Sequence, residues 1–165
     1  MGIEPEQTPR ASLDRRGLGL ALLALTAGTL VYLFARAPTT YVAWPVQDLA
    51  LPRLGAGLLA ASLPSLCHAF AFGWLGAELL RPWRLAARGF VIGWMLFEAA
   101  VEVAQIKALA RGIDSALASL GGAWADAIGG YLMRSTFDAA DLAAVAAGGA
   151  AAWWVHVNPR LGRTT

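Results

Sequence analysis

The sequence has little charge and almost no cysteine. Charged residues make up 15% of the 165 residues, whereas roughly a quarter is usual for a soluble domain. Cys67 is the only cysteine, which excludes a disulfide-stabilised fold. The 13 basic and 11 acidic residues nearly balance, at a net charge of +2. Such a balance argues against a protein that follows nucleic-acid phosphates, so we expect no nucleic-acid partner.

Apolar residues dominate instead. They make up 58% of the chain, and the mean hydropathy is +0.54. This composition excludes a disordered chain and favours an integral membrane protein. Because a helix rises about 1.5 Å per residue, about 20 apolar residues cross a hydrocarbon core of roughly 30 Å. We therefore predict an all-α polytopic membrane protein, with one transmembrane helical domain over residues 17–157 and spans at about 17–36, 64–80, 89–106 and 142–157.

Two segments between these spans need separate treatment. Pro64 divides an uncharged run, so residues 54–63 are predicted to form a separate approach helix. Residues 113–133 are apolar and glycine-rich, with charges only at Asp114 and Asp126. We predict an interfacial or re-entrant helix over 113–133, in the connection between the third and fourth spans. A fifth span over these residues is the alternative.

The basic residues divide unevenly between the two sides of the four-span arrangement. Eight fall on one side: Arg10, Arg15, Arg16, Arg81, Arg84, Arg88, Arg160 and Arg163. Five fall on the other side: Arg36, Arg53, Lys107, Arg111 and Arg134. Cytoplasmic loops carry an excess of Lys and Arg, so both tails, residues 1–16 and 158–165, are predicted to be cytoplasmic. A composition rich in Ala, Gly, Leu and Arg, with a single lysine, is typical of a GC-rich bacterium, which indicates the bacterial inner membrane.

Polar residues interrupt the predicted spans in a pattern. Ionisable residues inside a membrane are costly and indicate a functional site by default. Glu98, Glu102 and Gln105 recur at i, i+4 and i+7, on one face of the third span. Arg134, Asp138 and Asp141 repeat that spacing before the fourth span, and His68 lies near the beginning of the second. The topology brings all of them to the outer half of the membrane, so the candidate ligand site consists of His68, Glu98, Glu102, Gln105, Arg134, Asp138 and Asp141.

Several chemistries fit this set. Closely packed carboxylates can share a proton, which suits acid–base work, and Arg134 suits a phosphate or simply neutralises Asp138. His68 with Glu102 suits a base and its orienting partner, or two metal ligands. The sequence contains no HExxH and no CxxC motif, so no metal and no other cofactor is predicted. A purely structural cluster that ties three helices together is the other interpretation.

A family pattern runs through the same residues. His68 is followed by Phe70 and Phe72; Glu102-Val103-Ala104-Gln105 comes next, and then Arg134 with Phe137-Asp138-Ala139-Ala140-Asp141 and Gly148. Over about residues 60–155 this resembles the VanZ-like family of small membrane proteins, named after a teicoplanin-resistance protein. The most specific part is the spacing of Asp138, Asp141 and Gly148. Val145 replaces an asparagine of the family pattern, and the long connection from Gln105 to Arg134 indicates an added surface.

The resemblance implies a cell-envelope protein whose outer polar cluster binds a lipid head group or a lipid-linked precursor, with membrane lipids as partners. The alternative is a non-catalytic accessory subunit that packs against a larger membrane protein complex, energy-transducing or photosynthetic. The small residues of Gly148-Gly149-Ala150-Ala151-Ala152 let another helix approach closely and support this alternative. The sequence identifies no catalytic residue, and it favours a non-catalytic role over an enzymatic one.

Overall fold

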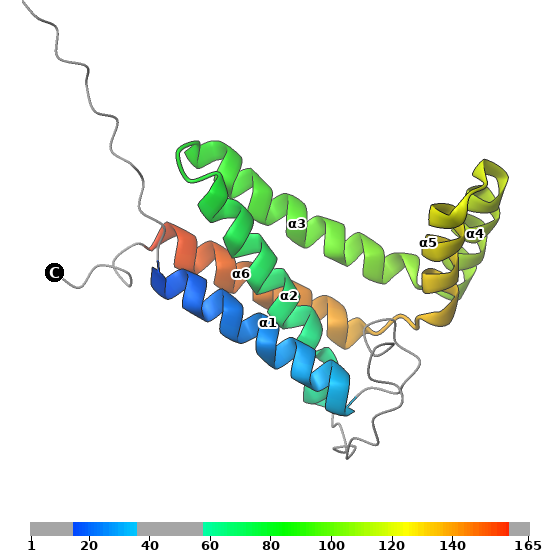
Figure 1. Ribbon diagram of the computed structural model, residues 1–165, viewed down its shortest axis with the longest axis horizontal. Helices are drawn as coiled ribbons and strands as arrows, with labels where there is room; N and C mark the ends of the chain where they lie inside the picture. Colours follow the sequence, from blue (N-terminus) through cyan, green and yellow to red (C-terminus); the bar gives the residue numbers. More distant parts are fainter. Residues whose placement is uncertain (1–14, 36–57, 159–165) are drawn as a thin grey trace, which may run out of the picture.

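The computed structural model describes residues 15–35 and 58–158, and most of these residues lie in helices (Figure 1). No strand occurs among them, so the predicted all-α class is confirmed. The helices are α1 (Arg15–Ala35), α2 (Leu58–Leu79), α3 (Arg84–Ala104), α4 (Lys107–Leu120), α5 (Ala123–Arg134) and α6 (Ala139–Val157).

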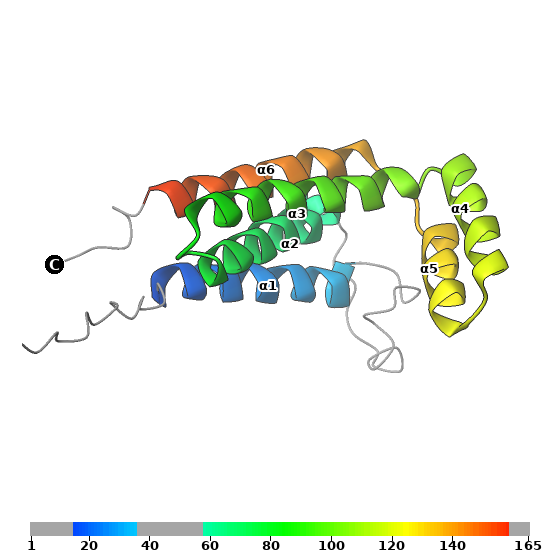
Figure 2. The ribbon, with the colours of Figure 1, turned by 90° about the horizontal axis from the view of Figure 1, so that it is seen from above.

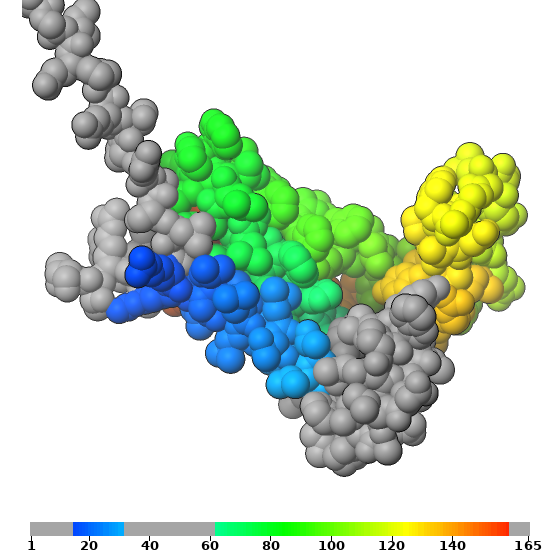
Figure 3. Space-filling model, in the orientation of Figure 1, coloured from blue at the N-terminus to red at the C-terminus, as the bar shows by residue number. Residues whose placement is uncertain are grey.

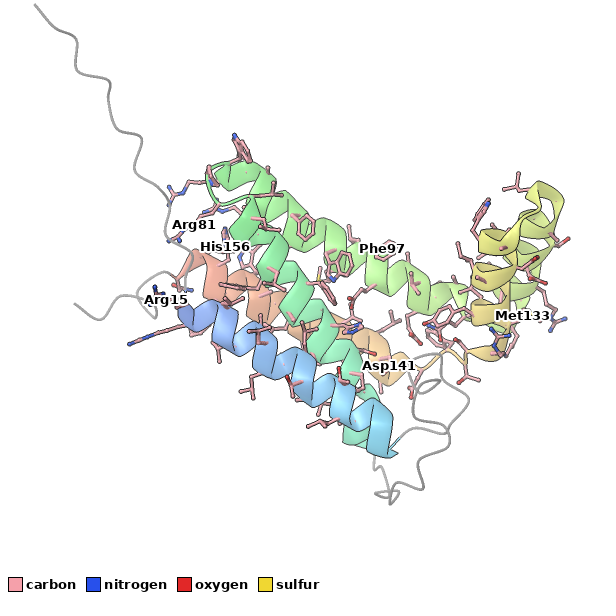
Figure 4. All side chains as sticks on the ribbon, viewed as in Figure 1. Arg15, Arg81, Phe97, Met133, Asp141 and His156 are labelled. Atoms are coloured by element: carbon pink, nitrogen blue, oxygen red, sulfur yellow. The ribbon has the colours of Figure 1, made fainter. Side chains whose placement is uncertain are left out.

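Four of the helices form a bundle. α1, α2 and α3 alternate in direction, and α6 runs beside α2 in the same direction (Figures 1 and 2). α1 and α3 therefore begin, and α2 and α6 end, at one end of the bundle, which we call the basic end. Figure 4 shows Arg15, Arg81 and His156 at this end, with Asp141 towards the opposite one. α4 and α5 project from that opposite end, which we call the hairpin end.

Small residues let the bundle helices pack closely. Trp74 of α2 is buried at the centre of the core, and the other buried core members are Ala21, Ala71, Ala77, Ala87, Val91 and Ala152. The closest approach is between α6 and α2, at Gly148. A Cβ added to Gly148 would collide with the backbone carbonyl oxygen of Leu66 and lie 3.0 Å from Ala69 Cβ. Because a backbone oxygen cannot rotate away, α6 can sit this close to α2 only with glycine at 148.

The prediction for the second helix is wrong at Pro64. α2 is continuous from Leu58 to Leu79, with Pro64 inside it, so residues 58–63 do not form a separate approach helix. Proline removes one backbone hydrogen bond from a helix, but packing compensates here. Pro64 is buried and faces α1, since a Cβ on Gly28 would lie in van der Waals contact with the Pro64 Cα, at 3.6 Å.

The third predicted span, 89–106, lies mostly within α3, which ends at Ala104. α3 starts at Arg84 and its last turn tightens: the amides of Gln105 and Ile106 donate to the carbonyls of Glu102 and Val103, at 3.1 and 3.0 Å. These i→i+3 bonds close the helix. Ile106 then adopts an extended conformation, with ψ of 121°, and α4 leaves at 97° to α3.

The connection over 113–133 contains two helices, so the prediction of one helix is wrong. α4 and α5 form a helical hairpin whose turn lies at Gly121 and Gly122, with φ of 68° and 97°. Only glycine adopts these angles without strain, so the two glycines end α4 and reverse the chain. Gly129 of α5 lies directly against the Asp114 side chain of α4, which shows how closely the two helices pack.

Lys107 closes the base of the hairpin. Its Nζ donates to the carbonyl oxygens of Met133 and Ser135, at 2.8 and 2.6 Å, and thus joins the start of α4 to the end of α5. We expect Lys107→Met to leave these carbonyls at the end of α5 without that donor, so amide protection over residues 123–134 should fall about tenfold. Hydrogen exchange in detergent measures this. Lys107→Arg keeps a donor and should retain most protection; equal protection in both variants would contradict this role.

None of the described helices is by itself long and apolar enough to cross a membrane. α3 and α4 reach that length and composition only together, across their 97° bend. The four predicted spans therefore stay a prediction. Arg10, Arg36, Arg53, Arg160 and Arg163 lie outside the described residues.

Candidate functional site

Buried polar side chains gather at the hairpin end. Within the described residues they are Ser62, Glu102, Gln105 and Asp141, each 7 or 8% exposed. Three of them were predicted from sequence, and Ser62 was not. Ser62 comes from α2, Glu102 and Gln105 from the end of α3, and Asp141 from the start of α6.

Glu102 is the centre of this cluster. Its Oε1 accepts a hydrogen bond from the backbone N–H of Asp138 at 2.9 Å, and its Oε2 accepts from Gln105 Nε2 at 3.0 Å. Both carboxylate oxygens are thus bound, and the end of α3 is fastened to the start of α6. Asp138 itself caps α6, because its Oδ1 accepts from the N–H of Ala140 at 2.9 Å. Glu102, Gln105 and Asp138 therefore hold the helices in place.

The predicted stripe of Arg134, Asp138 and Asp141 on one helix is wrong. α5 ends at Arg134, Ser135 is extended with ψ of 160°, and Asp138 is extended with φ of −132° and ψ of 121°. The preference of aspartate for the N-cap position outweighs continuation of the helix. Arg134 is exposed, and its guanidinium lies back along α5, so that a Cβ on Gly130 would be 3.2 Å from either Nη.

His68 and Glu98 lie at one level on facing helices. Phe72 of α2 contacts Trp94 of α3, with ring centroids 5.4 Å apart. The two helices are antiparallel, and one turn from this contact towards the hairpin end lies His68 on α2 and Glu98 on α3. His68 is exposed and meets the edge of Phe72 at 5.3 Å, while Glu98 is half-buried. Figure 3 shows α2 and α3 side by side on one face of the molecule, with α6 visible between them near the hairpin end.

The register of α3 and α6 relates this pair to the buried cluster. A Cβ on Gly149 of α6 would lie 2.9 Å from the sulfur of Met95 on α3. Two turns further towards the hairpin end lie Asp141 on α6 and Glu102 on α3, so these two carboxylates share a level. His68 and Glu98 lie about one turn, or roughly 6 Å, nearer the basic end. The site therefore has two layers: an accessible imidazole–carboxylate pair and a buried cluster beyond it.

The faces of α3 agree in part with the predicted pattern. Glu102 and Gln105 are buried, and Phe97 and Val103 are exposed, 56% and 37%, as the spacing predicts. Met95, which we expected on the outer face, is half-buried and packs on Gly149 instead. The third helix therefore turns a wider surface towards α6 than the polar residues alone indicate.

The side chains of this site favour hydrogen-bonded ligands. Within residues 15–35 and 58–158, no three His, Cys, Asp or Glu side chains are grouped so that they could hold a metal ion. An accessible imidazole and a half-buried carboxylate can instead receive the amine or hydroxyl groups of a polar ligand. Ser62 is a further buried hydroxyl at the same end of the bundle. Ser62 was not selected from the sequence, because Pro64 indicated a helix boundary at this point.

Comparison with known proteins gives no match. No protein-family model, no curated protein and no solved structure matches this chain. The resemblance to the VanZ-like family over about residues 60–155 stays a prediction.

Proposed function

We propose that this chain is an integral protein of the bacterial inner membrane, a divergent relative of the VanZ-like family. The support is the apolar surface of the bundle. α1 exposes Leu20, Leu22, Leu23 and Leu30, and α3 exposes Ile92, Leu96, Phe97 and Val103. Contiguous apolar surface of this kind is costly in water and is the ordinary exterior of a helix in lipid.

Charge supports the proposed orientation. Arg15, Arg16, Arg81, Arg84 and Arg88 all belong to the basic end, beside the exposed rings of Trp83 and Trp154. Arginine excess marks the cytoplasmic side of a membrane protein, and tryptophan is enriched at the interface. The hairpin end, with the buried carboxylates, then lies at the outer leaflet.

The outer site binds the polar head group of a lipid or of a lipid-linked precursor. The observation that carries this part is the accessible pair of His68 and Glu98, one turn nearer the basic end than the closed Glu102 cluster. Glu98 accepts hydrogen bonds from amine or hydroxyl groups of the head group, and the contact between Phe72 and Trp94 lies one turn further towards the basic end. Arg134, at the base of the hairpin, suits the phosphate of the same ligand.

The proposed site makes a sharp prediction for bound lipid. The protein is purified in mild detergent, and lipids that co-purify are identified by mass spectrometry. Glu98→Gln removes a charged acceptor, so retention of the preferred lipid should fall about tenfold or more. His68→Ala should act in the same direction and leave the fold intact, because His68 is exposed.

Asp126→Asn is the matched control, because Asp126 is an exposed carboxylate on α5 that lies outside the proposed site. It should retain as much lipid as the unaltered protein. Equal lipid retention in the Glu98→Gln and Asp126→Asn proteins would refute the head-group site. A chain that alkaline carbonate strips from the membrane fraction would refute the membrane setting.

A second function, an accessory subunit of a larger membrane complex, is favoured by the hairpin. α5 exposes Trp124, Ile128 and Tyr131, 42 to 55%, on an element that projects from the bundle. Such a surface fits a neighbouring membrane protein. Under this alternative, a protein co-purifies in stoichiometric amount and is lost in Trp124→Ser/Ile128→Ser, while the lipid retention described above does not depend on Glu98.

A further inference from the structure

We propose a second ligand site at the basic end: Arg84, Arg88 and His156 bind the phosphate of an anionic phospholipid from the cytoplasmic leaflet. The site lies at the opposite end of the bundle from His68 and Glu98. This second site depends on the proposed function only in that the protein must lie in a membrane. It does not require a ligand at the outer site.

Basic side chains from two elements converge here. Arg81, Arg84 and Arg88, from the α2–α3 connection and the start of α3, all lie close enough to the His156 imidazole to act on its charge. Glu78 is the carboxylate among them, and Arg81 Nη1 donates to its Oε1 at 3.0 Å. Figure 4 shows Arg81 and His156 beside each other at this end, together with Arg15. Among the described residues of this end, arginines outnumber carboxylates, so these residues attract anions.

Arg88 is held against the bundle by a ring contact. The guanidinium of Arg88 lies over the ring of Trp153, 5.9 Å from its centroid. A stacked guanidinium has lost part of its freedom before a ligand arrives and still directs N–H groups outward. Arg84 and Arg88 occupy positions i and i+4 of α3, so both side chains project from the same face.

The first turn of α3 adds to this field. Trp83 occupies its N-cap position and, in the part of the chain described, provides no capping side-chain hydrogen bond. Backbone N–H groups at a helix start carry a partial positive charge and favour an anion. They lie directly beside Arg84, so they strengthen a site that the arginines define.

Exposed apolar side chains identify a lipid, rather than soluble phosphate, as the ligand. Leu79, Trp83 and Leu85 flank Arg84 in sequence and are 73%, 64% and 84% exposed. An apolar rim around a cationic centre matches a phospholipid, whose phosphate is attached to acyl chains. A soluble phosphate or a nucleic acid would not cover these side chains.

Vesicle binding tests the site directly. The full chain is reconstituted into phosphatidylcholine vesicles with or without 20 mol% (about one lipid in five) phosphatidylglycerol, and lipid selection is measured by native mass spectrometry and by spin-labelled lipid. We expect the protein to select phosphatidylglycerol. Arg84→Gln/Arg88→Gln should weaken this selection about 20-fold, since each arginine near an anionic surface contributes about fivefold.

Two variants control this result. Arg111→Gln removes an exposed arginine from α4, at the other end, and should leave the selection unchanged. Arg84→Lys/Arg88→Lys keeps the charge and should restore most of it. Equal selection in the Gln/Gln and unaltered proteins would overturn the site, and so would displacement of the lipid by millimolar (about 1 mM) inorganic phosphate or by RNA. If the protein does not insert into vesicles, the proposed membrane location is refuted. If it inserts but does not select phosphatidylglycerol, only the proposed phospholipid site is refuted.

Discussion

Replacing Gly148 with alanine is expected to lower the free energy of unfolding by about 2–3 kcal/mol, because overpacked cores lose this much when the neighbours cannot move. The new Cβ would meet the Leu66 carbonyl oxygen and the Phe70 nitrogen, the latter at 3.0 Å. Both are backbone atoms of α2, so α6 as a whole has to move away. Thermal unfolding in detergent, followed by circular dichroism, measures the loss.

Gly93→Ala is the matched control for this substitution. Gly93 lies inside α3, and nothing lies within 4 Å of a Cβ added there. Alanine favours a helix over glycine by roughly 0.5–1 kcal/mol, so this variant should be slightly more stable than the unaltered protein. If Gly148→Ala were equally stabilising, the close approach of α6 to α2 would be wrong.

Glu102→Ala is expected to be as damaging or more so. It removes the acceptor of the Asp138 N–H and of the Gln105 amide, at 2.9 and 3.0 Å, and opens a cavity. Hydrogen bonds to a charged acceptor contribute about 1.5–3 kcal/mol each, so the expected loss in the free energy of unfolding is about 3 kcal/mol. Hydrogen exchange should show the start of α6 losing protection first, because that is where Glu102 holds it.

Glu102→Gln separates this structural role from a role for charge. A glutamine carbonyl can still accept from the Asp138 N–H, and the Gln105 side chain can turn its own oxygen towards the new amide. We expect the loss in the free energy of unfolding to be less than half of the loss in Glu102→Ala. If Gln and Ala were equally destabilising, the charge of Glu102 rather than its hydrogen bonds would hold the two helices.

Periodicity predicted the helix faces that matter most. Glu102 and Gln105 are three residues apart, and this spacing placed both on one buried face, as the structure shows. α6 begins at Ala139, near the predicted start at 142, because its apolar run is long and uninterrupted. Where a helix buries one continuous stripe, spacing alone suffices to predict it.

Features decided by contacts between helices could not be predicted in this way. Pro64 indicated a helix boundary, but α2 is continuous through it and Pro64 packs on α1. Asp138 indicated a continuing helical stripe, whereas it caps α6 while its N–H binds Glu102. These outcomes depend on residues more than 30 positions away, which local patterns do not contain.

The side-by-side packing of α2 and α6 also sets an order of events during synthesis. Leu66 and Gly148 are separated by three intervening helices, so their contact forms only after almost the whole chain has left the ribosome. Until then α2 can pair with α1 and α3, but the face that receives α6 stays uncovered. Contacts this distant in sequence form late and slowly. A nascent chain arrested before residue 139 should consequently bind chaperones and be cleaved by proteases. Both effects should end once α6 has emerged from the ribosome.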